Sequence, residues 1–353
     1  MFHYYTEDGS VFSSKVEAME YSHKSNTPLH FYYYDEEYSR VPWTLEPPQS
    51  LDYYYLEQAK RIRDQYDYVI LCYSGGYDST NILETFHYNG LKLDKIVAVG
   101  AFDQDNYTIS DENHNGELYL NVFPYIKELG LEGILQVVDY SKLFSDLSNF
   151  SILNQKDSWV DLCGGWFSPH HWFWHDAERY IVPEEFKNKK VAILFGKDKP
   201  ALFSDGNNLV SGFRFRDTPV NSYGSTSLNR QNLDNIKRID FYWDPEYPEI
   251  LVKQLHVLRR HFLLTQKLGY DDLEAVGTIG ESSINSLVYN LRKPILFKSP
   301  KSKTYYLSLR DQFLKSKMNS LVAETHNRGI AELTARIGDK SPQPIFSKFY
   351  SII

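Results

Sequence analysis

With 353 residues, of which 42% are hydrophobic and 24% charged, the chain has the size and composition of a globular protein with one large or two small domains. The net charge of −8 excludes a surface that is basic throughout and leaves only a local basic patch open for nucleic-acid binding. Two cysteines, Cys72 and Cys163, are too few for a disulfide framework, so a reducing compartment is expected.

The start of the sequence, Met1 to Tyr5, lacks the basic and then apolar pattern of a signal peptide. No apolar run reaches the roughly 20 residues that cross a bilayer. We therefore expect a cytoplasmic protein with no membrane partner.

Residues 1–48 predict a small α+β unit. Asp8-Gly9 is a hairpin turn signal between two short strands, and Ser14 with Glu17 forms a capping box for a helix over 15–23. A further strand is expected over 30–34, and the prolines that follow it predict a linker over 42–48.

Residues 49–215 alternate between strands and helices, and a helix capped by Ser50 comes first. The apolar runs predict strands over Val69–Tyr73, Lys95–Phe102, Ile134–Asp139 and Val191–Phe195. Helical spacing predicts helices over Leu51–Gln65, Ser79–Tyr88 and Glu117–Leu129. This order predicts an α/β fold with a doubly wound, mainly parallel sheet, which binds ligands at the carboxyl ends of its strands.

Residues 68–86 carry the main functional signal. The strand Val69–Tyr73 leads into Ser74-Gly75-Gly76, and a helix begins after Asp78. Glycines let the backbone approach a ligand closely, and the N–H groups at a helix start attract anions. Because no lysine follows the second glycine, this is not the Walker phosphate loop.

The stretch Ser74-Gly75-Gly76-Tyr77-Asp78-Ser79 resembles the Ser-Gly-Gly-x-Asp-Ser motif of the PP-loop ATP pyrophosphatases. The resemblance implies an adenine nucleotide alpha hydrolase-like fold that binds ATP and Mg2+ and leaves pyrophosphate and an adenylylated substrate. It assigns Asp78 to loop orientation and Mg2+ binding. The residues that it assigns to ATP are Ser74, Gly75, Gly76, Tyr77, Ser79 and Thr80.

The same resemblance predicts site residues at the ends of two further strands. The strand after the motif implies a nucleoside pocket lined by Gly100, Ala101 and Phe102. The strand over 191–195 is followed by Gly196-Lys197-Asp198-Lys199, which loosely matches a Gly-x-Gly-x-Asp-Glu loop of asparagine synthetase-type domains. The match makes Asp198 a second Mg2+ ligand, although Lys199 replaces the glutamate of the family loop. Because a glycine and charged residues at the carboxyl end of a strand belong in the ligand crevice, Gly196 is expected to contact the nucleotide, and Lys197 or Lys199 to neutralise phosphate charge. A solvated charged turn is the alternative.

Residues 158–179 hold four of the six tryptophans, together with three histidines. Cys163, His171 and His175 could form a zinc site, with His170 beside them, because these side chains are common zinc ligands. The competing interpretation is an aromatic wall that packs in the core or stacks on a substrate ring.

Residues 216–353 predict a mostly helical region for substrate or partner binding. A helix begins near Pro248 and carries Lys253, His256 and Arg260 on one face. This basic stripe could contact a nucleic-acid backbone or an anionic substrate, and a solvated helix face is the alternative.

Among PP-loop proteins, the chain is most similar to asparagine synthetase-like synthase domains, without their glutaminase domain, since Phe2 stands where the nucleophilic cysteine would be. This similarity implies an AMP-forming ligase that activates a carboxylate, amide or carbonyl substrate for a nitrogen nucleophile. The expected substrate is a small molecule, and ammonia comes from a partner or from free ammonium. The alternatives are modification of a nucleobase or tRNA, a non-catalytic ATP-binding module, and an interaction protein with an incidental glycine turn.

Overall fold

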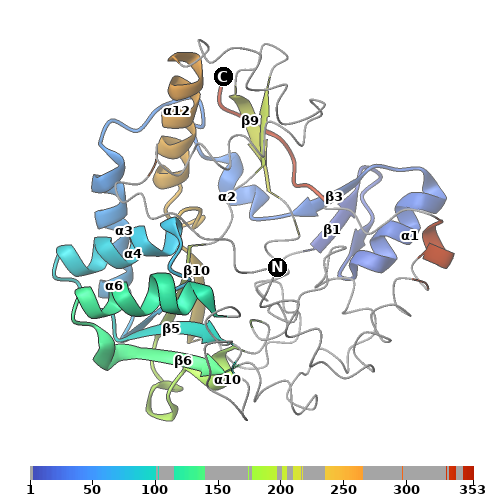
Figure 1. Ribbon diagram of the computed structural model, residues 1–353. Coiled ribbons are helices and arrows are strands. Elements are labelled where there is room, and N and C mark those ends of the chain that lie inside the picture. Colours follow the sequence, from blue (N-terminus) through green and yellow to red (C-terminus); the bar gives the residue numbers. More distant parts are fainter. Residues whose placement is uncertain are drawn as a thin grey trace.

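The structure is a computed structural model whose central feature is a parallel sheet of five strands in the order β10-β7-β4-β5-β6 (Figure 1). It describes residues 3–100, 102, 115–139, 174, 177–196, 201–204, 210–215, 217, 235–264, 296, 331, 334–338 and 345–353. The sheet strands are β4 (Tyr68–Cys72), β5 (Lys95–Gly100), β6 (Leu135–Asp139), β7 (Val191–Phe195) and β10 (Ile236–Asp240). The predicted α/β fold with a mainly parallel sheet is confirmed.

Successive residues of the sheet strands pack on opposite faces, as the two-residue period of a strand requires. One face buries Leu71, Ala98 and Leu194 in the main core, together with residues of α3 (Leu51–Gln65), α4 (Tyr77–Tyr88), α6 (Phe123–Glu128) and α12 (Glu249–Leu264). The other face buries Ile70 and Ile193 beneath α10 (Glu178–Ile181). The strands are apolar on both sides because both of their faces are covered.

The helices begin and end near the predicted residues. Ser14 Oγ accepts a hydrogen bond from Glu17 N, and Ser50 Oγ accepts one from Tyr53 N, so both predicted N-caps are confirmed. The helices are α1 (Lys15–Ser25), α2 (Asp35–Ser39), α3 (Leu51–Gln65), α4 (Tyr77–Tyr88), α6 (Phe123–Glu128), α10 (Glu178–Ile181) and α12 (Glu249–Leu264). Two single 3-10 turns are η2 (Glu132–Ile134) and η5 (Glu184–Phe186).

The helix predicted over 117–129 is a π turn, η1 (Leu118–Val122), followed by α6. The backbone N–H of Phe123 bonds to the carbonyl of Leu118, five residues earlier. Pro124 has no N–H, and its ring crowds the carbonyl four residues before it. The wider π turn accommodates this proline without ending the helix.

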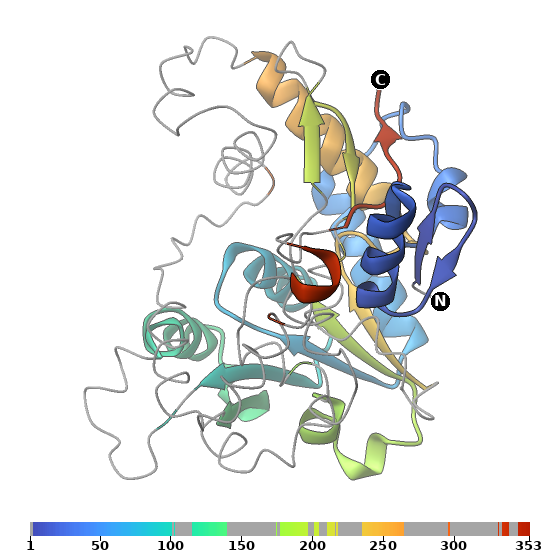
Figure 2. The ribbon, with the colours of Figure 1, turned by 90° about the vertical axis from the view of Figure 1, so that its right-hand side faces the viewer.

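Two small sheets lie beside the large one. The first is the predicted N-terminal hairpin with a third strand, in the order β2-β1-β3, and the second has the order β11-β9-β8. Their strands are β1 (His3–Thr6), β2 (Val11–Phe12), β3 (Leu29–Tyr32), β8 (Ala201–Ser204), β9 (Val210–Arg214) and β11 (Tyr350–Ser351). Figure 2 shows α12 beside the strands of the second sheet.

Strand β10 lies in a region where the sequence predicted mostly helices. Residues 216–353 were expected to be mostly helical, but Ile236 to Asp240 form a strand that pairs with β7. Arg238 obscures the pattern because a buried strand is expected to be apolar. Its guanidinium is buried against Glu178, with Nε–Oε1 and Nη2–Oε2 distances of 2.5 Å. The sheet therefore extends beyond the boundary expected at residue 215.

Within the described ranges, none of the helices has both the length and the apolar character needed to cross a bilayer.

Candidate functional site

The strand order places a topological switch point between β4 and β7. From β4 the chain passes to β5 and β6 on one side, and then returns to β7 and β10 on the other side of β4. Doubly wound proteins bind ligands where this reversal leaves a crevice, outside the carboxyl ends of the two strands. The loop over 73–76, which follows β4, and Gly196, which follows β7, occupy this position.

The 73–76 loop has the geometry of an anion cradle. Gly75 has φ of +68°, which favours glycine, and Gly76 is the N-cap of the 12-residue helix α4. Both glycines are buried, yet none of the described hydrogen bonds uses their backbone N–H groups. Buried N–H groups at the positive end of a helix attract an anion.

Two hydroxyls flank these glycines and have different roles. Ser79 is 3% exposed, and its Oγ donates to the carbonyl of Gly76 at 3.2 Å while accepting from the N–H of Ser74 at 3.3 Å. These bonds close the loop. Ser74 is exposed, and its Oγ lies 3.3 Å from Ser79 Oγ, so this hydroxyl can reach both the loop and a ligand.

Thr80, which the motif assigned to ATP, has a partner within the chain. It is fully buried, and its Oγ1 lies 3.3 Å from the hydroxyl of Tyr73. Burial raises the pKa of Tyr73 to about 12, and the hydrogen bond to Thr80 opposes this rise, so Tyr73 stays neutral. The pair braces the end of β4 against α4, which leaves Ser74 as the accessible hydroxyl of the loop.

Gly196 touches the first turn of α4 so closely that no side chain fits there. A Cβ at this position would lie 2.9 Å from the backbone carbon of Asp78 and 2.9 Å from the backbone nitrogen of Ser79. The sequence predicted that Gly196 belongs to the same crevice as the motif. The structure brings the two together, about 120 residues apart in the chain, through the pairing of β4 with β7.

At the end of β5, the predicted nucleoside pocket is partly filled by the chain itself. A Cβ on Gly100 would meet Leu118 Cδ1 at 2.7 Å, Phe102 Cε2 at 2.8 Å and Asn115 Oδ1 at 3.0 Å. The backbone N–H of Phe102 donates to Asp139 at 3.2 Å. On this face, Gly100 packs against protein, while Phe102 is half-buried beside it.

A tyrosine from the turn after the edge strand β10 holds the first turn of α4. The hydroxyl of Tyr242 donates to the carbonyl of Asp78 at 2.6 Å and accepts from Asn81 Nδ2 at 3.1 Å. Burial, and then the charge of Asp78, raise the pKa of Tyr242 well above its usual value, so it remains a neutral donor. No sequence motif pointed to Tyr242, since its contact depends on where β10 ends.

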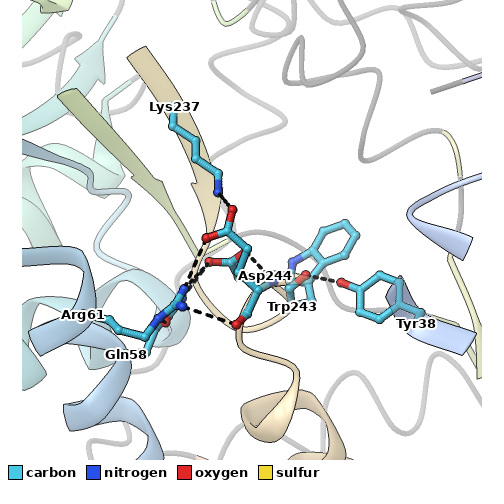
Figure 3. A network of polar contacts seen from close by, with 7 residues as sticks. Tyr38, Gln58, Arg61, Lys237, Trp243 and Asp244 are labelled. Carbon is cyan, nitrogen blue, oxygen red and sulfur yellow. Dashed lines mark hydrogen bonds and ion pairs between the residues drawn. The ribbon is translucent and has the colours of Figure 1, made fainter. Parts of the chain in front are cut away.

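The turn that carries Tyr242 is fixed by a polar network around Asp244 (Figure 3). Asp244 is 3% exposed, and its carboxylate accepts from Gln58 Nε2 at 3.0 Å and lies 3.5 Å from Arg61 Nη2. The carbonyl of Trp243 accepts from the Tyr38 hydroxyl at 2.5 Å. These contacts join α3 and the N-terminal unit to the turn after β10.

The metal and charge predictions are only partly within the described residues. Asp78 is half-buried in the first turn of α4. The described part of the chain has no group of three or more His, Cys, Asp or Glu residues that could hold a metal ion. Mg2+ needs fewer, since one or two carboxylates hold it together with phosphates. The predicted residues outside the described ranges are Ala101, Cys163, His170, His171, His175, Lys197, Asp198 and Lys199.

The basic stripe on α12 contacts the linker over 42–48. Lys253 Nζ lies 2.6 Å from Glu46 Oε1, and Arg260 pairs with the other oxygen of the same carboxylate. His256 Nε2 lies 2.9 Å from the carbonyl of Trp43. Since all three side chains have partners within the chain, the stripe gives no support to nucleic-acid binding.

No family model matches the chain, and no curated protein matches it significantly.

Proposed function

We propose that the chain is an ATP-dependent enzyme that forms AMP and pyrophosphate, with the adenine nucleotide alpha hydrolase-like fold of the PP-loop ATP pyrophosphatases. One observation carries the proposal: the motif Ser74-Gly75-Gly76-Tyr77-Asp78-Ser79 occupies the switch point of a parallel sheet. A closed loop, buried glycines and a helix start at this position are together typical of an anion-binding site, and an incidental glycine turn would not require them.

In this proposal the pyrophosphate part of ATP is held by the N–H groups of Gly75 and Gly76, by the start of α4 and by the hydroxyl of Ser74. Donors that are already fixed in place stabilise charge that develops during the reaction without reorganising. The hydrogen bonds of Ser79 and Tyr242 fix these donors. Lys197 and Lys199 keep their predicted role of neutralising the leaving pyrophosphate.

The residues near the loop also fit Mg2+. When bound, Mg2+ stabilises negative charge on the phosphate oxygens. Asp78 fits as a carboxylate ligand because it is half-buried in the first turn of α4, next to the proposed phosphate cradle. Asp198 is the second predicted ligand.

For the acceptor we favour a small molecule with a carboxylate, amide or carbonyl group, which is adenylylated and then attacked by a nitrogen nucleophile. This is asparagine synthetase-like amidation, with ammonia from free ammonium or from a partner. The basic stripe gives no support to a nucleobase or tRNA acceptor, because Lys253, His256 and Arg260 contact the linker.

The test is to incubate the protein with ATP and Mg2+ and to measure AMP, ADP and pyrophosphate, first with ammonium and a pool of amino acids, then with bulk tRNA. Asp78→Asn and Ser74→Ala should each abolish AMP formation. Asp64→Asn is the control, because Asp64 is an exposed aspartate in the last turn of α3, which ends just before the amino end of β4.

AMP and pyrophosphate in equal amounts, released only with one pool, would establish the reaction and the acceptor class. ADP in place of AMP would overturn the mechanism. Tight binding of ATP without turnover in either pool would favour the non-catalytic ATP-binding module. If ATP does not bind at all, the remaining interpretation is an interaction protein with an incidental glycine turn.

A further inference from the structure

Asn121, in the π turn η1, lies directly against the 73–76 loop. A side chain at Gly75 would meet Asn121 Cβ at 2.7 Å and its neighbour Val122 at 3.3 Å. Asn121 and Val122 of η1 therefore form one wall of the loop. Asn121 is a direct neighbour of Gly75, one of the two glycines in the proposed anion cradle.

The amide of Asn121 is a buried donor that lacks an acceptor. Among the described contacts, its Nδ2 is buried and has no hydrogen-bond partner. Most buried polar groups in native proteins are paired, because leaving one unpaired destabilises the fold. An unpaired donor beside an anion cradle therefore indicates a ligand that supplies the acceptor.

The π turn that carries Asn121 is a second, independent departure from ordinary structure. Such turns are rare and are frequently found at functional sites. Here the turn is closed by the bond from Phe123 N–H to the carbonyl of Leu118. The π turn and the unpaired amide meet at Gly75, a position where the backbone has φ of +68°.

We propose that Asn121 binds the polyphosphate of the nucleotide and donates Nδ2–H to a phosphate oxygen held in the 73–76 loop. The inference rests on the proposed function and adds a residue that the motif does not contain. The chemistry matches, because the unpaired group is a donor and phosphate oxygens are acceptors. The location fits as well, because Nδ2 is two bonds from Asn121 Cβ, which lies beside Gly75.

The test titrates inorganic pyrophosphate, and separately ATP with Mg2+, into the full chain by calorimetry and records thermal unfolding without ligand. Asn121→Leu keeps the side-chain size but removes the donor. We expect pyrophosphate to bind about tenfold more weakly, as for loss of a hydrogen bond to a charged group, while the unliganded protein melts at the same or a higher temperature. Asn121→Asp should bind more weakly still, because its carboxylate repels the anion.

Leu120→Ala is the matched control, since Leu120 is 56% exposed on the same π turn and should leave both affinities unchanged. Wild-type affinity in Asn121→Leu would overturn this inference and leave the proposed function standing. Weaker binding together with a lower melting temperature would mark Asn121 as structural and would also overturn it. If the wild-type protein binds neither pyrophosphate nor ATP, the proposed function itself fails.

Discussion

Two glycines at the loop are required for different physical reasons. Gly75 has a positive φ, a backbone conformation that residues other than glycine adopt only at an energetic cost. Gly196 does not have a positive φ, but the backbone of α4 occupies the space that a side chain at this position would need. The first glycine shapes the loop, and the second lets β7 approach the helix start.

Gly196→Ala tests the second role. The added methyl would lie 2.9 Å from backbone atoms of Asp78 and Ser79, and backbone cannot rotate away as a side chain can. We expect a loss of about 1–3 kcal/mol of stability, typical of overpacking, and pyrophosphate binding weakened at least about tenfold. Thermal unfolding and calorimetry measure the two effects.

Gly133→Ala is the control, since a Cβ there meets nothing within 4 Å. It should leave stability within about 0.5 kcal/mol of wild type, as surface changes usually do. If Gly196→Ala bound pyrophosphate as tightly as wild type, the close contact with α4 would not matter for the site.

At the residue scale, the sequence alone identified the motif residues but not the residues that contact the motif from elsewhere in the chain. Ser74, Gly75 and Asp78 stand together in the chain, so their spacing identified them. Asn121 contacts the loop and Tyr242 contacts the first turn of α4 that follows it, and their positions depend on a π turn and on the end of β10. Spacing along a sequence does not encode such contacts.

Among the elements, caps and apolar runs predicted most boundaries to within a few residues. Leu51–Gln65 and Val191–Phe195 agree with the structure, because an N-cap serine or a fully buried strand leaves a local pattern. Strand β10 did not, because Arg238 is neutralised by Glu178, a partner distant in sequence. A long-range ion pair can make a charged residue acceptable in a buried strand.

Asp94 joins three elements at the amino end of the sheet. Its carboxylate accepts from the N–H of Val69 in β4 at 2.9 Å and pairs with Arg63 of α3 at 2.6 Å and with Lys92 at 2.7 Å. Burial alone would raise the pKa of this carboxyl, but the bonds from Lys92, Arg63 and Val69 lower it below its usual value. The folded state therefore favours the carboxylate.

The lowered pKa predicts a specific acid dependence. A carboxyl with a lower pKa in the folded state stabilises the protein above its unfolded pKa of about 4, and this contribution is lost as pH falls through the folded pKa. Asp94→Asn should be less stable by about 1–3 kcal/mol at pH 7, and the difference should shrink below about pH 4. Urea unfolding over a pH series measures it.

Asp64→Asn, an exposed change on α3, should track the wild type at every pH. A constant difference between Asp94→Asn and wild type down to pH 2 would show that the charge of Asp94 does not stabilise the fold. Asp94 precedes β5 at the amino end of the strands, and the loop lies at their carboxyl end. The Asp94→Asn variant should therefore keep normal affinity for pyrophosphate.

At the scale of the whole molecule, the N-terminal unit is bound to the rest by a buried ion pair. Lys15 Nζ of α1 lies 2.6 Å from Asp217 Oδ2, and both side chains are at most 1% exposed. Asp217 also accepts from the Tyr4 hydroxyl at 3.2 Å and from the N–H of Ile345 at 2.9 Å. One carboxylate therefore connects α1, β1 and the segment that leads to β11.

Lys15→Met tests how far the molecule unfolds as one unit. The change leaves a buried carboxylate without its cation, which typically costs about 3–5 kcal/mol. Since Asp217 links three segments, we expect a lower melting temperature but still a single cooperative transition in calorimetry. Lys24→Met on the same helix removes an exposed pair, with Lys24 68% exposed, and should cost less than about 1 kcal/mol.

Adding Asp217→Asn to Lys15→Met separates charge from packing. The asparagine oxygen can still accept from Ile345 N–H, while the unpaired charge is gone, so the double variant should be more stable than Lys15→Met alone. Two separate transitions in Lys15→Met would instead show that residues 1–48 fold as an independent domain. In that case the pair with Asp217 docks one unit on another, and the sheet that carries the loop would retain its melting temperature.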